Sequence, residues 1–208
     1  KQDLPRACEL YALAAAQGHE HALMNLCRVL CTGSPVVRDP QRAFALLRRH
    51  ILAEEQSVYA NHRLGCIYHG LWPPAGPIVK QDLDLAATHF ARSASDANLN
   101  TTCQRFGRPL SPHCQNCTAQ RHMCSESRYN LACLAAVQGA PDEALEWLAK
   151  AVAAGFSNHN GALRDDELVT IQPLPRALLV GMRRNAAEAA AAAERARLEA
   201  EEEAQRPR

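Results

Sequence analysis

The chain has 208 residues, which is enough for one elongated domain or two small ones with a substantial apolar core. Its 23 lysines and arginines nearly balance its 22 acidic residues, so there is no strong positive charge that would make nucleic acid or an anionic membrane the expected partner. Hydrophobic residues make up 47% of the chain but aromatic residues only 5%, and this alanine-rich composition favours closely packed helices over a β-sandwich.

Two further features concern location. No apolar run reaches the roughly 20 residues that a membrane-spanning helix needs, so no direct membrane span is expected. The first residue is Lys1 rather than Met, which is typical of a processed or partial chain, and the absence of a targeting peptide therefore leaves the compartment open.

Residues 12–43 predict two helices and the start of a third. The first helix is predicted to end at Gly18, because glycine is the commonest residue just beyond a helix C-terminus. After the second helix and a Gly-Ser-Pro loop, Asp39 followed by Pro40 has the pattern of a helix start. The second helix has one apolar face, formed by Ala22, Leu26, Val29 and Leu30.

The same cycle returns downstream. Val58–Gly70 has apolar residues at helical spacing, a Pro-rich loop containing Trp72 follows, and Leu83–Ala94 predicts another helix. Ala97–Phe106 is predicted as a degenerate third copy. Trp72 is expected either to pack on its own repeat or to anchor a protein interface. The recurrence of helix, loop and helix indicates a repeat protein, in which each hairpin buries its apolar face against a neighbour.

Residues 107–128 contain prolines, polar residues and cysteines without a sustained helical period, so they are predicted to form an irregular insertion or connection. Cys114 and Cys117 have the two-residue gap that presents two thiolates to one tetrahedral metal ion. Cys103 or His113, together with Cys124 or His122, are candidates to complete a structural zinc site. A second such pair is absent. Zinc ligation, local disulfides and unlinked thiols therefore stay open for these four cysteines.

The other five cysteines fall within helical patterns. Small core residues are the expected role, because free cysteine is among the most buried residue types, and disulfides that staple helices in an oxidising compartment are the alternative. These are Cys8, Cys27, Cys31, Cys66 and Cys133. The odd total of nine leaves at least one thiol unpaired or joined to another chain.

Tyr129–Phe156 encodes one helical hairpin almost completely. Alanines and leucines lie at helix-pairing positions on both sides of a turn at residues 139–142, and the alanines allow two backbones to approach closely. The paired positions are Leu131, Ala132 and Ala135 on one helix and Ala144, Leu148 and Ala151 on the other. Leu163–Met182 follows with an acidic start and spaced leucines, which predicts one or two short helices that cap the stack.

Residues 183–208 consist almost entirely of alanine, glutamate and arginine, all strong helix formers. A helix is predicted there, with a rise of about 1.5 Å per residue along its axis. Its sequence has no apolar stripe. It is either a solvated helix or an arm that lies along a partner subunit. Its candidate partner contacts are Arg183, Arg184, Arg195 and Arg197.

The N-terminal repeats resemble the Sel1-like repeat family, which is related to the tetratricopeptide repeat. In the first copy the resemblance rests on Ala15-Ala16-Gln17-Gly18, Ala22, Asn25-Leu26, Gly33, Val37, Asp39 and Ala43. In the second copy it rests on Ala60, Leu64-Gly65, Tyr68, Gly70, Val79, Asp82 and Ala86. Cys27 stands where the family usually has Gly, and Leu30 where it usually has Tyr. The hairpin at 129–156 is similar to a tetratricopeptide repeat, with Phe156 in place of the usual closing Pro.

The resemblance implies an all-α fold, a right-handed α-solenoid of Sel1-like and tetratricopeptide-like hairpins. The predicted parts are Sel1-like repeats at 1–106, the cysteine-rich insertion at 107–128, a hairpin with capping helices at 129–182 and the C-terminal helix at 183–208.

The resemblance also implies a non-catalytic protein–protein interaction scaffold, an accessory subunit of a larger complex whose partners are other protein subunits. The sequence agrees, because it contains no GxSxG, GxxxxGK or GxGxxG motif. The family includes disulfide-stapled members in oxidising compartments, among them a mitochondrial cytochrome oxidase assembly factor. The similar cysteine richness here favours a mitochondrial location over the cytosol or secretory pathway, and makes a disulfide-stapled or zinc-binding assembly factor the alternative function.

Overall fold

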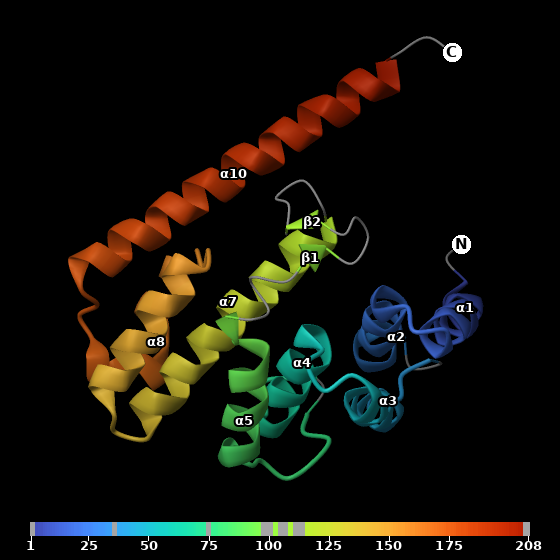
Figure 1. Cartoon of the computed structure of the whole chain (residues 1–208), viewed down its shortest axis with the longest axis horizontal. Coiled ribbons are helices and arrows are strands. Elements are labelled where there is room, and N and C mark those ends of the chain that lie inside the picture. The colour runs from blue at the N-terminus through green and yellow to red at the C-terminus, as the bar shows by residue number, and fades with distance from the viewer. Residues whose placement is uncertain are drawn as a thin grey trace. The chain divides into compact units, whose positions relative to one another are not determined.

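The structure is a computed structural model that describes residues 3–34, 37–73, 76–96, 102–103, 108–109 and 115–205. Nearly all of these residues are helical, and helices that follow one another in the chain form hairpins (Figure 1). The predicted all-α fold of helical hairpins is therefore confirmed. The chain divides into two compact units, residues 1–127 and 128–208, with the boundary inside one helix.

Unit 1 contains five complete helices in its described part, and each packs against the next one in the chain (Figure 1). They are α1 (Leu4–Ala16), α2 (Glu20–Thr32), α3 (Pro40–Ala53), α4 (Val58–His69) and α5 (Leu83–Ser93). Two short strands, β1 (Thr102–Cys103) and β2 (Arg108–Pro109), pair antiparallel. At residues 102–103 the predicted degenerate helical copy is therefore wrong, and 97–101 and 104–106 lie outside the described residues.

Side-chain caps begin four of these helices. Each capping oxygen accepts a hydrogen bond from the backbone N–H three residues later, which satisfies a donor that the helix itself leaves unpaired. The caps are Asp3 to Arg6 (3.0 Å), Asp39 to Arg42 (2.9 Å), Ser57 to Ala60 (3.1 Å) and Asp82 to Leu85 (2.9 Å). The helix start predicted from Asp39 and Pro40 is thus confirmed.

The main apolar core of unit 1 lies between α2, α3 and α4, with Cys8 of α1 and Met123 also buried in it. Leucines fill much of it, and Cys27 and Cys31 are 0% and 2% exposed, as expected for small core residues. Gly65 allows α4 and α5 to approach closely, because a Cβ added there would lie 2.6 Å from the ring of Phe90. The leucines and isoleucine that are at most 2% exposed are Leu26, Leu30, Leu47, Leu64 and Ile67.

Unit 2 is built on the hairpin of α7 (Gln115–Val137) and α8 (Pro141–Ala153). The turn between them uses Gly139, whose φ of 77° lies in the left-handed region that favours glycine. Ala132, Ala144, Leu148 and Ala151 are 0% exposed, so the predicted pairing positions are buried as expected. The remaining elements are α9 (His159–Arg164), the 3-10 helix η1 (Asp166–Ile171) and α10 (Arg176–Gln205).

The irregular connection predicted at 107–128 is wrong from residue 115 onward, because α7 begins at Gln115. The buried positions of this part of the helix carry Cys117, Met123, Cys124 and Ser127 rather than leucines. A helical period made of cysteine, methionine and serine is easily missed in the sequence, because these residues also suit a loop or a metal site.

The C-terminal helix predicted from residue 183 begins seven residues earlier, at Arg176. Its first turns are part of the packed core, where Met182 is 0% exposed. Asn185 anchors the helix to this core, because its side-chain amide donates to the carbonyls of Val152 (2.7 Å) and Phe156 (3.1 Å). The short capping helices predicted between 163 and 182 correspond to η1 and the start of α10. Within the described part of the chain, no helix has both the length and the apolar composition needed to cross a bilayer.

Candidate functional site

A cleft of about 370 Å³ in unit 1 is the first candidate site. It lies among the first turns of α1, the last turns of α2 and the segment that leads into α3. Its lining residues are Pro5, Cys8, Glu9, Leu30, Val37, Arg38, Asp39 and Arg42. The arrangement therefore combines an apolar floor with charged groups of both signs.

The cations of this cleft are more available than its carboxylates. Asp39 accepts the backbone N–H of Arg42, and Glu9 forms an ion pair with Arg6 at 2.7 Å. Arg38 makes one long hydrogen bond, from Nε to the carbonyl of Gly33 at 3.4 Å. Among the described residues, the guanidinium of Arg42 has no ion-pair partner. Both arginines are exposed, so the cleft can offer guanidinium groups to a carboxylate ligand.

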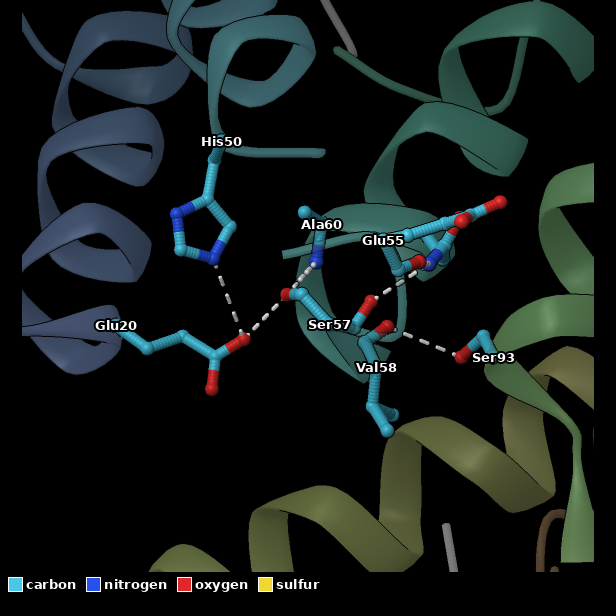
Figure 2. A network of polar contacts seen from close by, with 8 residues as sticks. Glu20, His50, Glu55, Ser57, Val58, Ala60 and Ser93 are labelled. Atoms are coloured by element: carbon cyan, nitrogen blue, oxygen red, sulfur yellow. Dashed lines mark hydrogen bonds and ion pairs between the residues drawn. The ribbon is translucent and has the colours of Figure 1, made fainter. Parts of the chain in front are cut away.

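A polar network links α2, α3 and α4 through Glu20, His50 and Ser57 (Figure 2). Ser57 donates a short hydrogen bond to the carboxylate of Glu20 and accepts one from Ala60 N at 3.1 Å. His50 points its Nε2 toward the same carboxylate, at 4.0 Å. Ser57 therefore caps α4 and at the same time ties it to α2, which is a structural role.

A second chain of hydrogen bonds runs through the interior of unit 1. Ser127 donates to Ser93 at 2.9 Å, and Ser93 donates to the carbonyl of Val58 at 3.1 Å. Because both hydroxyl protons are then used, Nδ1 of His62 must carry the proton in its 2.9 Å bond to Ser127. Nε2 of His62 is left as the acceptor for the thiol of Cys66, at 3.7 Å.

Cys66 and His62 have the residue types of a nucleophile and its base, but their environment keeps both neutral. Burial, followed by the charges of Arg63 and His122, lowers the pKa of His62 to about 3. Burial raises the pKa of Cys66 to about 12, against the opposing effect of Arg63. A neutral thiol that donates to a neutral imidazole is a packed hydrogen-bond pair and not an activated nucleophile.

Unit 2 contains a different cluster, formed by Tyr129 and Cys133 of α7 with Asp165 and Glu167 around the start of η1. The Tyr129 hydroxyl donates a short hydrogen bond to Oδ2 of Asp165, and the Cys133 thiol donates to the same oxygen at 3.8 Å. Oδ1 of Asp165 accepts the backbone N–H of Glu167 at 3.0 Å. Burial raises the pKa of Tyr129 and of Cys133, and the neighbouring carboxylates raise the pKa of Cys133 further.

The residues predicted to contact partners are found at the surface or near it. Trp72 is partly buried and packs on its own repeat, with the guanidinium of Arg63 5.2 Å from its ring centroid. Arg183, Arg184 and Arg195 are exposed on α10, and Arg184 lies 3.8 Å from Glu188. The side chain of Arg197 is outside the described ones. The contact role of all five residues stays a prediction.

The predicted zinc ligands are only partly described. Cys117 and Cys124 are 1% and 0% exposed on α7. They are seven residues apart, or about 10.5 Å along the helix axis, whereas zinc–sulfur bonds are about 2.3 Å long. An intact α7 thus does not favour both as ligands of one ion. Cys114 and the side chain of Cys103 lie outside the described residues, so the four-cysteine zinc site stays a prediction.

The polar residues inside both units are not predicted by the sequence pattern; they include His62, Ser93 and Ser127 in unit 1 and Asp165 in unit 2. Their location in the sequence could have indicated His62 and Ser93, because both fall within predicted helices. A polar residue on the buried face of a helix needs an internal hydrogen-bond partner. Nothing in the sequence spacing joins Tyr129 or Cys133 to Asp165, which is 32 residues away from Cys133.

These hairpins of short helices, packed in chain order, define an α-helical repeat protein. The model of the Sel1 repeat matches residues 1–19, 20–49, 58–98 and 125–156, which together are more than half of the chain. The chain therefore belongs to the Sel1 repeat family, and repeats of this family generally mediate protein–protein interactions. The fourth match shows that the hairpin predicted as tetratricopeptide-like is itself a Sel1 repeat. No curated protein and no solved structure matches the chain.

Proposed function

We propose that this chain is a non-catalytic scaffold that binds segments of other proteins as an accessory subunit of a larger assembly. The cleft of unit 1 is the observation that carries the proposal. Its volume of about 370 Å³ suits a few side chains of a bound polypeptide. Membership of the Sel1 family supports a protein as the partner.

The chemistry of the cleft favours a partner segment with both acidic and apolar side chains. Leu30 and Val37 supply apolar surface. Arg38 and Arg42 present guanidinium groups, which bind carboxylates through paired hydrogen bonds. The carboxylates of Glu9 and Asp39 are engaged within the protein, so they compete little for these cations.

Charge reversal in the cleft tests this proposal. Arg42→Glu should remove the proteins that co-purify in stoichiometric amounts with the tagged full-length chain, because it opposes an acidic segment. The matched control is Arg49→Glu, which makes the same charge change at an exposed position of the same helix, away from the cleft. Circular dichroism should show that both variants fold. An unchanged set of bound subunits in Arg42→Glu would overturn the role of the cleft.

The C-terminal arm is the second contact region, with Trp72 as an additional anchor. The arm should be tested by removing residues 186–208, because this truncation retains Asn185 and its two hydrogen bonds to the core. Removal of all residues from 183 onward would also remove that anchor and would confuse lost folding with lost binding. Retention of every bound subunit after truncation at 186 would count against the arm.

The second candidate function is a disulfide-stapled or zinc-binding assembly factor, with mitochondria as the proposed compartment. Its support is the number of cysteines, nine, together with the resemblance to mitochondrial members of the family. Disulfide stapling is not favoured for Cys8, Cys27, Cys31, Cys66 or Cys133, which carry free thiols. Thiol titration and mass measurement of the chain isolated from its native cells should settle this point. A mass deficit of two per cysteine pair would support disulfides, and imaging of a tagged chain would test the compartment.

A further inference from the structure

Three chemically different metal-ligand groups meet in unit 2. Cys133 comes from α7, Asp165 directly precedes η1, and Glu167 lies within η1. One ligand atom of each lies within 4.8 Å of the others, and within the described part of the chain no other group of three or more such side chains meets in this way. Cys133 is 2% exposed, and both carboxylates are half-buried. The group is therefore neither a set of exposed acidic residues nor a single cysteine.

The distances suit a small tetrahedral ion. A zinc ion about 2.3 Å from sulfur and about 2.0–2.2 Å from oxygen holds a sulfur and an oxygen ligand on the order of 3.5 Å apart. Sγ of Cys133 and Oδ2 of Asp165 are 3.8 Å apart. Glu167 needs to move its carboxylate by a small amount, within the freedom of a half-buried side chain.

The charges in the cluster also favour a divalent cation. Two carboxylates lie beside one thiol, and a single thiol proton cannot be donated to both at once. A divalent cation that replaces this proton would bond to the sulfur and to both carboxylates together. On binding, the thiol proton leaves to solvent, and the resulting thiolate and two carboxylates face a charge of plus two.

Neighbouring groups hold the central ligand in place. Asp165 is oriented by the Tyr129 hydroxyl at Oδ2 and by the Glu167 N–H at Oδ1. The Tyr129 ring is in turn fixed by stacking on Phe156, with centroids 4.4 Å apart and planes 10° from parallel. Hydrogen bonds of this kind orient metal ligands and tune their affinity.

We propose that Cys133, Asp165 and Glu167 form a zinc-binding site, with Tyr129 as a positioning residue. The thiolate selects a borderline-soft ion such as Zn²⁺ over Mg²⁺ and Ca²⁺, which prefer oxygen ligands alone. Three protein ligands leave the fourth tetrahedral position for water. The bound ion would join the hairpin of α7 to η1. This site shares no residue with the predicted four-cysteine site.

Metal binding to the full-length chain tests the proposal directly. The reduced protein, stripped of metal, should bind Zn²⁺ at this site in a one-to-one ratio, measured by elemental analysis after dialysis. Co²⁺ should produce the charge-transfer absorption of a thiolate-bound cobalt ion. Cys133→Ser should abolish that absorption, and Glu167→Gln should weaken Zn²⁺ binding at least tenfold.

Matched variants separate this site from the other cysteines. Cys124→Ser changes an equally buried cysteine of the same helix and should leave the Glu167-dependent binding unchanged. Glu167→Gln keeps every hydrogen bond between Tyr129, Cys133 and Asp165, so it decides the question even if Cys133→Ser does not fold. Zn²⁺ binding that is equally tight in Glu167→Gln, or that depends on Cys124 and not on Cys133, would overturn the proposal.

Discussion

The two units bury different kinds of side chain between their helices, although the same repeat model matches both. Among the described residues, seven of the eight buried polar ones lie in unit 1, where Asn61, His62 and Ser93 join helices through hydrogen bonds. Unit 2 instead brings α7 and α8 together through alanines such as Ala132 and Ala144, both 0% exposed. One repeat plan is thus compatible with two ways of fixing helix pairs.

The difference has consequences for tolerance to mutation. In unit 1 the hydrogen-bond partners define which residues must face each other, and an unpaired polar group in the interior is costly. In unit 2 the helices pack closely through alanines, so a larger side chain at a buried position must push a helix away from its neighbour. Each unit should therefore be sensitive to a substitution of a different kind.

The largest expected effect is the loss of Phe90, the largest fully buried side chain among the described residues of unit 1. Phe90→Ala should lower the free energy of unfolding of this unit by about 3–5 kcal/mol, because it leaves a cavity next to Gly65 and His62. Hydrogen exchange of the amides of α4 and α5 is the measurement. Leu85→Ala, at a 41% exposed position of the same helix, is the control and should cost much less.

Added volume should be the more damaging change in unit 2. Ala151→Leu should lower the free energy of unfolding by about 1–3 kcal/mol, because Ala151 is 0% exposed within the α7–α8 core. Ala153→Leu adds the same atoms at an exposed position of α8 and should cost little. Chemical denaturation followed by the fluorescence of Trp147, which lies on α8, can compare them. Equal stability of the two variants would contradict close packing through alanine.

The two units also differ in how much of their structure could be predicted from the sequence. The alanine spacing predicted the hairpin of unit 2, because helix packing through small residues is a local and periodic signal. The start of α7 was missed, because Cys117, Met123 and Ser127 occupy its buried positions and give no apolar period. The candidate sites depend on pairs such as Cys133 with Asp165, which only the fold brings together. The cleft depends in the same way on α1 lying beside the segment that leads into α3.

The buried histidine of unit 1 should make stability depend on pH. The pKa of His62 is about 3 in the folded chain, below its ordinary value of 6.5, so the unfolded chain takes up the proton first as the pH falls. The stabilising contribution is therefore complete above about pH 6.5 and is lost between about pH 6.5 and pH 3. The slope approaches 1.4 kcal/mol per pH unit, by order of magnitude.

Urea denaturation at several pH values from about pH 7.5 to about pH 5.5 measures this slope. His62→Gln should reduce the slope even if it lowers stability at every pH. His19→Gln, which changes an exposed histidine, should leave the slope as in the wild type. A slope that is unchanged by His62→Gln would show that His62 does not carry the pH dependence.

A smaller effect is expected at the start of α4. Ser57→Ala should cost about 1 kcal/mol, because it removes the cap of the Ala60 N–H and the hydrogen bond to Glu20. Glu20→Gln keeps the cap and neutralises the carboxylate that Ser57 and His50 face, so it should cost less. A double-mutant cycle of these two changes measures their coupling. Zero coupling would mean that Ser57 stabilises α4 as a cap without joining it to α2.

The smallest effect on stability should come from removing the C-terminal arm, residues 186–208 of the chain. Most of the described side chains of α10 after Ala186 are exposed, and the Arg184–Glu188 ion pair joins side chains that are 74% and 71% exposed. Exposed pairs contribute little, about 0–1 kcal/mol. Removal of residues 186–208 should therefore change the free energy of unfolding by less than about 0.5 kcal/mol.

Asn185→Ala in the full-length chain should cost more than that whole truncation, because it leaves the carbonyls of Val152 and Phe156 without their side-chain donor. If the truncation is the more costly of the two, the packed part of unit 2 extends further along α10 than Asn185.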